Sequence, residues 1–169
     1  MQNDARSLNL EGDYMADYSF YFNTKFVCGR SSLGYLDELG SSRTALVIDS
    51  RALAADRLEK IRKLLTGSGR VCQVVADVNA EPSTDAVDKV LENIRKFKPD
   101  CILAIGGGSV LDTAKALWVF YEHPDYTWEQ AFTPFGVEKL GKAAQLVAVP
   151  TTSGTGSETT CVAVITDSE

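Results

Sequence analysis

The stretch AIGGGSVLDTAKA, residues Ala104–Ala116, places three consecutive glycines between an apolar run and a helical pattern. The apolar run is CILAI, residues Cys101–Ile105. Consecutive glycines are costly in backbone entropy, so the missing side chains need a physical reason. Two reasons are open at this point. Gly106, Gly107 and Gly108 either form a tight turn between a strand and a helix, or they make room for a ligand.

Strands and helices are predicted to alternate on both sides of the glycines. Apolar runs predict strands at 44–49, 71–76, 100–105 and 145–149, with further candidates at 18–27 and 162–165. Apolar residues at helical spacing predict helices at 56–65, from 82–85 to before Pro99, and from 109 to about 121. This alternation predicts an α/β fold, a Rossmann-like parallel sheet flanked by helices with right-handed crossovers.

Length and composition narrow the class of protein. A chain of 169 residues predicts a single domain, 1–169. Its net charge of −6 and its lack of a basic tract argue against nucleic acid and against an anionic membrane surface. No apolar run reaches membrane-spanning length, and the N-terminus has no signal-peptide pattern. Four widely separated cysteines favour reduced thiols and a cytoplasmic location.

The position of the glycines favours anion binding. In an open parallel sheet, ligands bind at the carboxyl ends of the strands, where these glycines lie. The helix that follows presents free N–H groups and the positive end of its dipole. The run matches neither the GxGxxG nor the Walker pattern. In the alternative interpretation Ser109 and Asp112 form a capping box, and the glycines are only a turn.

A second small-residue loop, Pro150–Thr160, follows the last predicted strand and reads PTTSGTGSETT. Its threonine and serine hydroxyls suit ribose and phosphate oxygens. A flexible surface linker is the alternative. Two such loops at one edge of a sheet could enclose a nucleotide together, and this favours a binding site.

Together, GGGSVLDTAK and PTTSGTGSE resemble the iron-containing alcohol dehydrogenase family. The resemblance extends upstream through TALVID and through FVCGRSSLGYLDEL, the segment that leads into the family's nucleotide domain. It implies an N-terminal α/β dinucleotide-binding half and a helical C-terminal half that carries a metal. By this resemblance, the chain supplies the NAD(P)-binding part of an enzyme that transfers hydride between an alcohol or aldehyde and a nicotinamide cofactor.

The resemblance also implies roles for particular residues. The glycine loop Gly106–Gly108 and Ser109 would hold the pyrophosphate, and Asp112 would lie near the nicotinamide end of the cleft. Lys115 shares a helix face with Asp112, and either an ion pair between them or a cofactor role is open. The threonine-rich loop would line the nucleotide through Thr151, Thr152 and Thr155.

The residue after the first strand bears on the choice between NAD and NADP. A carboxylate there accepts from ribose hydroxyls and repels a 2′-phosphate, whereas arginine attracts that phosphate. The sequence has Asp49-Ser50-Arg51 at this point, which favours NAD if Asp49 is the aligned residue. Asp49 as a simple turn residue is the alternative.

The family's metal, usually iron or zinc, is held by one aspartate and usually three histidines of the C-terminal half. This chain has one histidine, His123, interpreted as a helix-end residue. We therefore expect no metal site and no assigned catalytic residue in this chain, and we interpret the sequence as an inactive fragment that ends at Glu169. Self-association is also possible. The alternatives are a stand-alone nucleotide-binding or interaction module, and a relative of glycerol dehydrogenase or dehydroquinate synthase.

Overall fold

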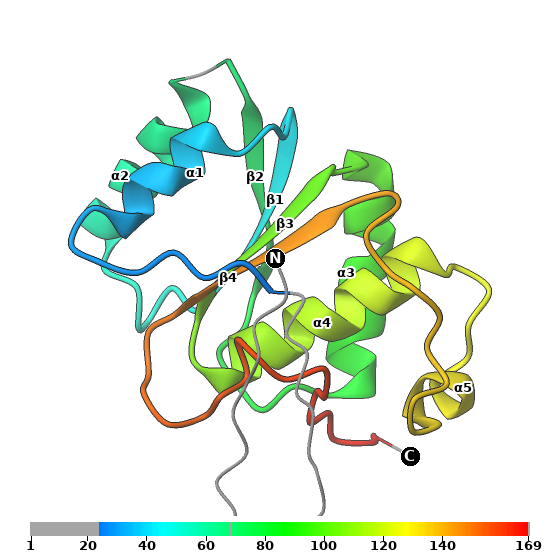
Figure 1. Ribbon diagram of the computed structural model, residues 1–169. Coiled ribbons are helices and arrows are strands. Elements are labelled where there is room, and N and C mark those ends of the chain that lie inside the picture. Colours follow the sequence, from blue (N-terminus) through cyan, green and yellow to red (C-terminus); the bar gives the residue numbers. More distant parts are fainter. Residues whose placement is uncertain (1–23, 68, 169) are drawn as a thin grey trace, which may run out of the picture.

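The computed structural model describes residues 24–67 and 69–168 (Figure 1). Its strands form one parallel four-stranded sheet in the order β2-β1-β3-β4. The strands are β1 (Arg43–Ile48), β2 (Val71–Asp77), β3 (Cys101–Gly106) and β4 (Gln145–Pro150). The helices are η1 (Ser32–Gly34), α1 (Tyr35–Glu38), α2 (Ala55–Thr66), α3 (Thr84–Phe97), α4 (Gly108–Glu122) and α5 (Trp128–Phe132). The predicted Rossmann-like α/β fold is confirmed.

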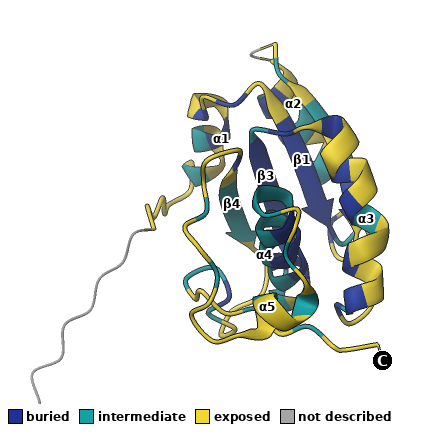
Figure 2. Ribbon diagram, turned by 90° about the vertical axis from the view of Figure 1, so that its right-hand side faces the viewer, coloured by how far each residue is buried: buried dark blue, intermediate teal, exposed yellow. Residues whose placement is uncertain are grey.

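Helices cover both faces of the sheet, and the strand sequences show why. Successive side chains of a strand point to opposite faces, so a strand covered on both sides is apolar throughout. All six residues of β3 are buried (Figure 2). Ile102 and Ala104 pack in the cluster with α3 and α4, whereas Leu103 and Ile105 pack in the cluster with α1 and α2. The molecule therefore has two core layers, one on each face of the central strands.

The pairing of β3 with β4 brings the glycine motif and the threonine-rich motif together. β3 and β4 pair in parallel, and Gly106 lies opposite Pro150 at the end of the ladder. One further backbone hydrogen bond, from Thr151 N to Gly106 O (2.9 Å), continues the pairing into the loops. The glycine loop and the threonine-rich loop therefore leave the sheet side by side.

Two predicted strands differ from the structure. The segment 162–165 forms no strand, because side chains of α4 take its polar backbone groups. Lys115 Nζ donates to Val162 O (2.7 Å), and Asp112 Oδ2 accepts from Val164 N (3.1 Å). Of the candidate at 18–27, residues 24–27 are irregular and the rest lies outside the described residues.

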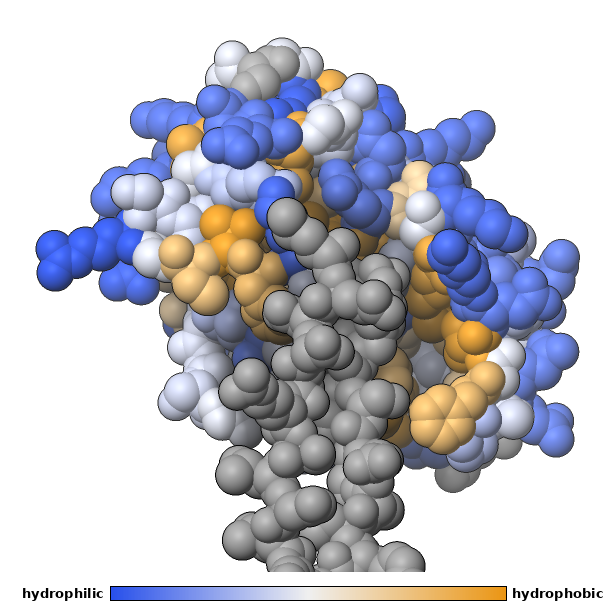
Figure 3. Space-filling view, viewed as in Figure 1, coloured by the Kyte–Doolittle hydropathy of each residue, from blue (hydrophilic) through white to orange (hydrophobic). Residues whose placement is uncertain are grey.

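The surface of the described chain is mixed. The face in Figure 3 shows hydrophilic side chains with separate apolar patches between them. None of the helices in residues 24–67 and 69–168 is long and apolar enough to cross a membrane. The exposed large hydrophobic residues are Phe26, Val27, Leu33, Val71, Phe132, Phe135, Val162 and Val164.

Candidate functional site

Helix α4 begins at the carboxyl edge of the sheet without a side-chain cap. Its N-cap is Gly107, in extended backbone (φ −80°, ψ −172°), and no side chain among the described residues accepts a hydrogen bond at this cap. The first N–H groups of a helix have no partner within the helix, and they carry the positive end of its dipole. This end of α4 can therefore bind an anion.

The predicted capping box is wrong. Ser109 lies inside the first turn of α4 rather than at the cap, and its carbonyl accepts from Thr113 Oγ1 (2.8 Å). The carboxylate of Asp112 turns toward the threonine-rich loop instead of back to the helix start. The helix begins two residues earlier than the box requires, because Gly107 supplies the N-cap and Gly108 the first helical residue.

Close packing, rather than an unusual backbone conformation, explains the three glycines. None of them has a positive φ. A Cβ on Gly106 would lie 2.4 Å from Cγ2 of Val110, so this glycine lets α4 start tightly against the strand. A Cβ on Gly107 would lie 3.2 Å from Thr152 Oγ1, and one on Gly108 would lie 3.5 Å from Thr155 Cγ2. Gly107 and Gly108 therefore let the threonine-rich loop pack closely against the start of α4.

The threonine-rich loop turns on two glycines in the left-handed region, Gly154 (φ 93°) and Gly156 (φ 67°), where other residues are strained. Beyond the turn, Gly156 O accepts from Thr159 N (2.9 Å), and Ser157 N donates to Thr155 Oγ1 (3.3 Å). These bonds give the loop a defined shape. The structure therefore does not support the linker interpretation.

A pocket of about 430 Å³ lies between the start of α4 and this loop. It brings together four of the predicted site residues: Gly108, Ser109, Asp112 and Thr155. The other pocket-lining residues are Glu81, Pro82, Ser157, Thr160, Val162, Val164 and Thr166. Uncapped amides and several hydroxyls at one opening fit the phosphate and ribose groups of a nucleotide. Four of the remaining predicted residues, Gly106, Gly107, Thr151 and Thr152, do not line the pocket but contact one another where the two loops leave the sheet.

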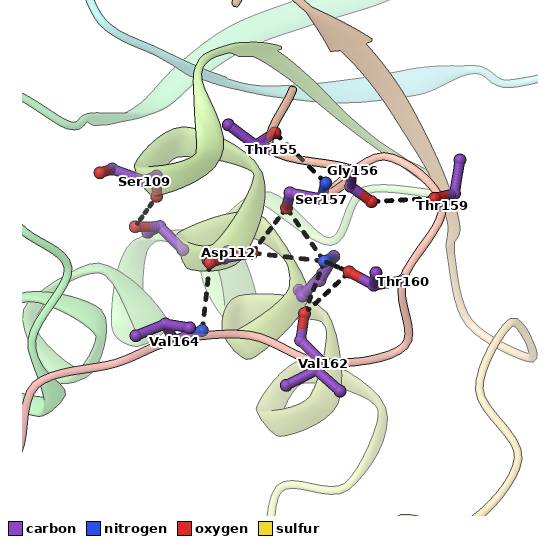
Figure 4. A network of polar contacts seen from close by, with 11 residues as sticks. Ser109, Asp112, Thr155, Gly156, Ser157, Thr159, Thr160, Val162 and Val164 are labelled. Carbon is purple, nitrogen blue, oxygen red and sulfur yellow. Dashed lines mark hydrogen bonds and ion pairs between the residues drawn. The ribbon is translucent and has the colours of Figure 1, made fainter. Parts of the chain in front are cut away.

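Asp112 connects α4 both to the threonine-rich loop and to the chain beyond it (Figure 4). Its Oδ1 accepts from Ser157 Oγ (2.6 Å) and from Lys115 Nζ (3.3 Å), and its Oδ2 accepts from Val164 N (3.1 Å). The Asp112 side chain is only 13% exposed. The predicted ion pair with Lys115 is present, but it is part of a partly buried network rather than a solvated surface pair.

Lys115, which carries the opposite charge, also connects α4 to this part of the chain. Its ammonium donates to Ser157 Oγ (3.0 Å), Thr160 Oγ1 (3.1 Å) and Val162 O (2.7 Å). Sequence reasoning missed Ser157, Thr160 and both valines as members of the site. Ser157 and Thr160 could have been found from their hydroxyl groups. Val162 and Val164 contribute only backbone groups, which a sequence pattern does not reveal.

Asp49 directly follows β1 at its carboxyl end and does not line the pocket. Its Oδ1 accepts from Arg51 N (2.9 Å) and Ala52 N (3.3 Å) and lies 3.6 Å from Arg51 Nε. Nearby, Asp77 accepts from both the hydroxyl (2.6 Å) and the amide (2.9 Å) of Ser50, and these bonds hold the pKa of Asp77 below its ordinary value. Asp49 therefore organises its own turn.

The described residues do not fit a metal ion. Within 24–67 and 69–168, no group of three or more His, Cys, Asp or Glu side chains is placed to hold one. His123 is the C-cap of α4, and its ring stacks on Tyr126 at 4.6 Å between centroids. It is a helix-end residue, as predicted.

Comparison with known proteins identifies a family that covers nearly the whole chain. The sequence profile of the iron-containing alcohol dehydrogenase family matches residues 23–169. The NADPH-dependent butanol dehydrogenase of Clostridium saccharobutylicum is 39% identical over 140 residues, which cover 82% of this chain and 36% of that protein. The bifunctional aldehyde-alcohol dehydrogenase of Escherichia coli K12 is 39% identical over 143 residues, 78% of this chain and 16% of that protein.

Solved structures agree. The iron-containing alcohol dehydrogenase from Thermococcus thioreducens superposes with a TM-score of 0.80 at 30% identity, over 89% of this chain and 41% of that one. Sulfoacetaldehyde reductase from Bifidobacterium kashiwanohense, solved in complex with NAD+, gives a TM-score of 0.75 at 25% identity, over 90% and 40%. The chain thus spans less than half of each of these relatives. From its parallel sheet, its paired loops and these matches, the chain belongs to the iron-containing alcohol dehydrogenase family.

Proposed function

We propose that residues 1–169 form a dinucleotide-binding domain and that the pocket at the start of α4 is its ligand site. The observation that carries this proposal is the uncapped helix start, which faces a hydroxyl-lined pocket at the carboxyl edge of a parallel sheet. In this proposal the amides of Gly107, Gly108 and Ser109 donate to the pyrophosphate. Thr151, Thr152 and Thr155 face the rest of the nucleotide, and Asp112 lies toward its nicotinamide end.

The reaction proposed for the enzyme is hydride transfer between an alcohol and the nicotinamide ring. The alcohol carbon gives a hydride to oxidised NAD(P), its hydroxyl gives up a proton, and an aldehyde results; the reverse reaction reduces the aldehyde. The names of the relatives, alcohol and butanol dehydrogenases, support this class of substrate. A divalent metal polarises the substrate oxygen in such chemistry, and the described residues of this chain do not hold one. This chain's own part is to bind and orient the cofactor.

NAD is the cofactor that we propose. The Asp49 carboxylate lies at the end of β1, where negative charge repels a 2′-phosphate. The Arg51 guanidinium, which would attract that phosphate, is engaged by Asp49 and by the carbonyl of Asn79. Among the relatives, one is named NADPH-dependent and another is solved with NAD+. Parallel titrations with NADH and NADPH test the choice, and tighter binding of NADPH would reverse it.

Substitution Gly107→Val tests the binding site itself. The backbone at Gly107 is open to any residue, and the nearest atoms belong to the exposed side chain of Thr152, so the fold should tolerate valine. We expect NADH affinity, followed by fluorescence titration, to fall by about thirtyfold or more as the side chain blocks approach to the amides. The melting temperature should change by only about 2–3 °C.

Gly40→Val is the matched control, because a Cβ at Gly40 meets nothing within 4 Å and this residue lies far from the pocket in the chain. It should bind NADH as the unmodified chain does. Equal affinity in the Gly107→Val variant would mean that the glycines serve packing alone, and the proposed site would be wrong.

A further inference from the structure

We propose that Lys115 is a positioning residue of the nucleotide pocket. Its ammonium holds the segment 157–166, called the strap below, across α4 and so fixes the pocket wall opposite the helix start. The identity of the ligand rests on the proposed function, whereas the contact between Lys115 and the strap does not.

The surroundings of Lys115 are unusual for a lysine on a helix. Its side chain is 14% exposed, and four oxygen atoms lie within 3.3 Å of its Nζ. One belongs to Asp112, and the other three belong to the strap: Ser157 Oγ, Thr160 Oγ1 and Val162 O. An ammonium has three N–H donors, so these oxygens satisfy it fully without water. A single cation thus joins two hydroxyls and one carbonyl of the strap to α4.

Few other interactions hold this part of the strap. It forms no helix or strand, and the side chains of Val162 and Val164 are 62% and 74% exposed, so they bury little apolar surface. The far end is attached separately: Ile165 packs against the core, and Thr166 bridges to Ser83. Between Ser157 and Val164, the hydrogen bonds that reach beyond the loop itself go to Lys115 and Asp112. The strap's position there therefore depends on the partly buried pair of Lys115 and Asp112.

The strap is also a wall of the pocket. Five of its residues line the cavity, facing Gly108, Ser109 and Asp112 of α4; they are Ser157, Thr160, Val162, Val164 and Thr166. The same oxygens that bind Lys115 therefore set the distance between this wall and the helix amides. If the ammonium is lost, the partly buried carboxylate of Asp112 has one partner fewer, and the strap loses three of its hydrogen bonds. The wall should then move away while the sheet, which makes none of these contacts, stays folded.

Substitution Lys115→Met in the full chain tests the inference with two readouts. Methionine keeps much of the stem and removes the charge. We expect amide hydrogen exchange within 157–164 to rise about tenfold or more, while exchange in β3 is unchanged. We expect NADH to bind about tenfold more weakly. Lys115→Arg keeps a cationic donor group and should recover most of both effects.

Lys96→Met is the matched control, because Lys96 pairs with Glu92 at 2.6 Å on an open surface where the two side chains are 71% and 75% exposed. It should match the unmodified chain in both readouts. Should Lys115→Met fail to fold, the double variant Ser157→Ala, Thr160→Val removes two acceptors while Lys115 and Asp112 stay paired, and it should show the same local rise in exchange.

Three results would overturn the inference: no rise in strap exchange, an equal rise across β1 and β3, or a loosened strap with unchanged NADH affinity. Failure of the unmodified chain to bind NADH would instead overturn the proposed function. In that case the exchange measurement would still decide whether Lys115 holds the strap.

Discussion

Gly106 has no room for a methyl group. A Cβ there would lie 2.4 Å from Cγ2 and 2.6 Å from Cβ of Val110, which is buried and has a stiff, branched side chain. At Gly108, by contrast, the nearest atom would be at 3.5 Å, an ordinary contact. Gly106 and Gly108, two glycines of one motif, therefore differ in how they tolerate a side chain.

Gly106→Ala should lower the free energy of unfolding by about 1–3 kcal/mol, because the strand and α4 must separate to fit the methyl group. Gly108→Ala should change it by less than about 0.5 kcal/mol. Urea unfolding followed by circular dichroism measures both. Equal stability of the two variants would show that α4 can shift freely at its start.

The thiols should differ sharply in reactivity. Burial raises the pKa of Cys101 to about 12, so at pH 8 its nucleophilic thiolate is almost absent. Cys28 and Cys161 are exposed. With a chromogenic disulfide reagent at pH 8, we expect Cys28 and Cys161 to react first and Cys101 to react only after the domain is unfolded. Rapid labelling of Cys101 in the folded chain, located by peptide mass mapping, would contradict the burial of β3.

At the scale of single elements, α3 shows both what sequence rules predict and what they miss. The helix begins within 82–85, as predicted, and Ser83 is its N-cap, whose Oγ accepts from Ala86 N (3.3 Å). The other end stops at Lys98 in the left-handed conformation (φ 51°, ψ 61°) rather than at a glycine. Pro99 marked this end in the sequence, but no residue rule assigns lysine to the left-handed cap.

Lys98→Gly should therefore stabilise the domain by about 1 kcal/mol, because glycine adopts this conformation without steric cost. Lys98→Ala is the control, since alanine carries the same Cβ and should give no comparable gain. Thermal unfolding of the three chains measures the difference, and a gain in both variants would mean that the lysine side chain, not its backbone, is unfavourable.

Glu122 at the end of α4 organises the chain that enters β4. Partial burial opposes its ionisation, but amides of Lys142, Ala143 and Ala144 donate to its carboxylate at 2.9–3.1 Å. Together these amides hold the pKa of Glu122 below its ordinary value. A lowered folded pKa stabilises the folded state above the unfolded pKa of about 4.3, and this stabilisation is lost as pH falls through the folded value.

Glu122→Gln should consequently be less stable than the unmodified chain at pH 7, by about 1 kcal/mol. The difference should shrink as pH falls below about 4, where the glutamate is protonated. Unfolding curves at several pH values test this directly. A difference that stays constant across the range would assign the effect to side-chain shape instead of charge.

Most elements could be predicted because their signals are local. The four strands and three long helices follow from apolar runs, periodicity, glycine and proline, and their ends agree to about a residue. The predicted strand at 162–165 failed because its fate depends on Asp112 and Lys115, which lie far away in the sequence. A local pattern cannot show that side chains of a helix take the backbone groups a strand would need.

At the scale of the whole molecule, the parallel sheet was predictable but its strand order was not, since the order depends on how crossovers pack. The two loop motifs were correctly placed at one edge. The contribution of Ser157, Thr160 and the valine backbone was not predicted, because it arises only when the strap lies on α4. The described site is therefore a product of tertiary structure more than of either motif alone.

Catalysis offers a test at this scale. With one histidine in its sequence, this chain should not oxidise ethanol or butanol at a measurable steady rate, even after incubation with Fe²⁺ or Zn²⁺. NADH binding to the same sample is the positive control for folding. Steady, metal-dependent formation of NADH from a simple alcohol by the pure chain would show that residues of this chain assemble an active metal centre.

The order of the chain has a consequence for how the pocket comes into being. Ser157, Thr160 and Val164 all follow β4, which is the last strand of the described sheet in chain order. The ribosome therefore synthesises all four strands of this sheet and the glycine loop before it synthesises the second wall of the pocket. A polypeptide released just before Ser157 would hold all the strands of the sheet and half of a binding site. Ribosome stalling at this point would thus yield molecules that contain the whole sheet but lack one wall of the pocket.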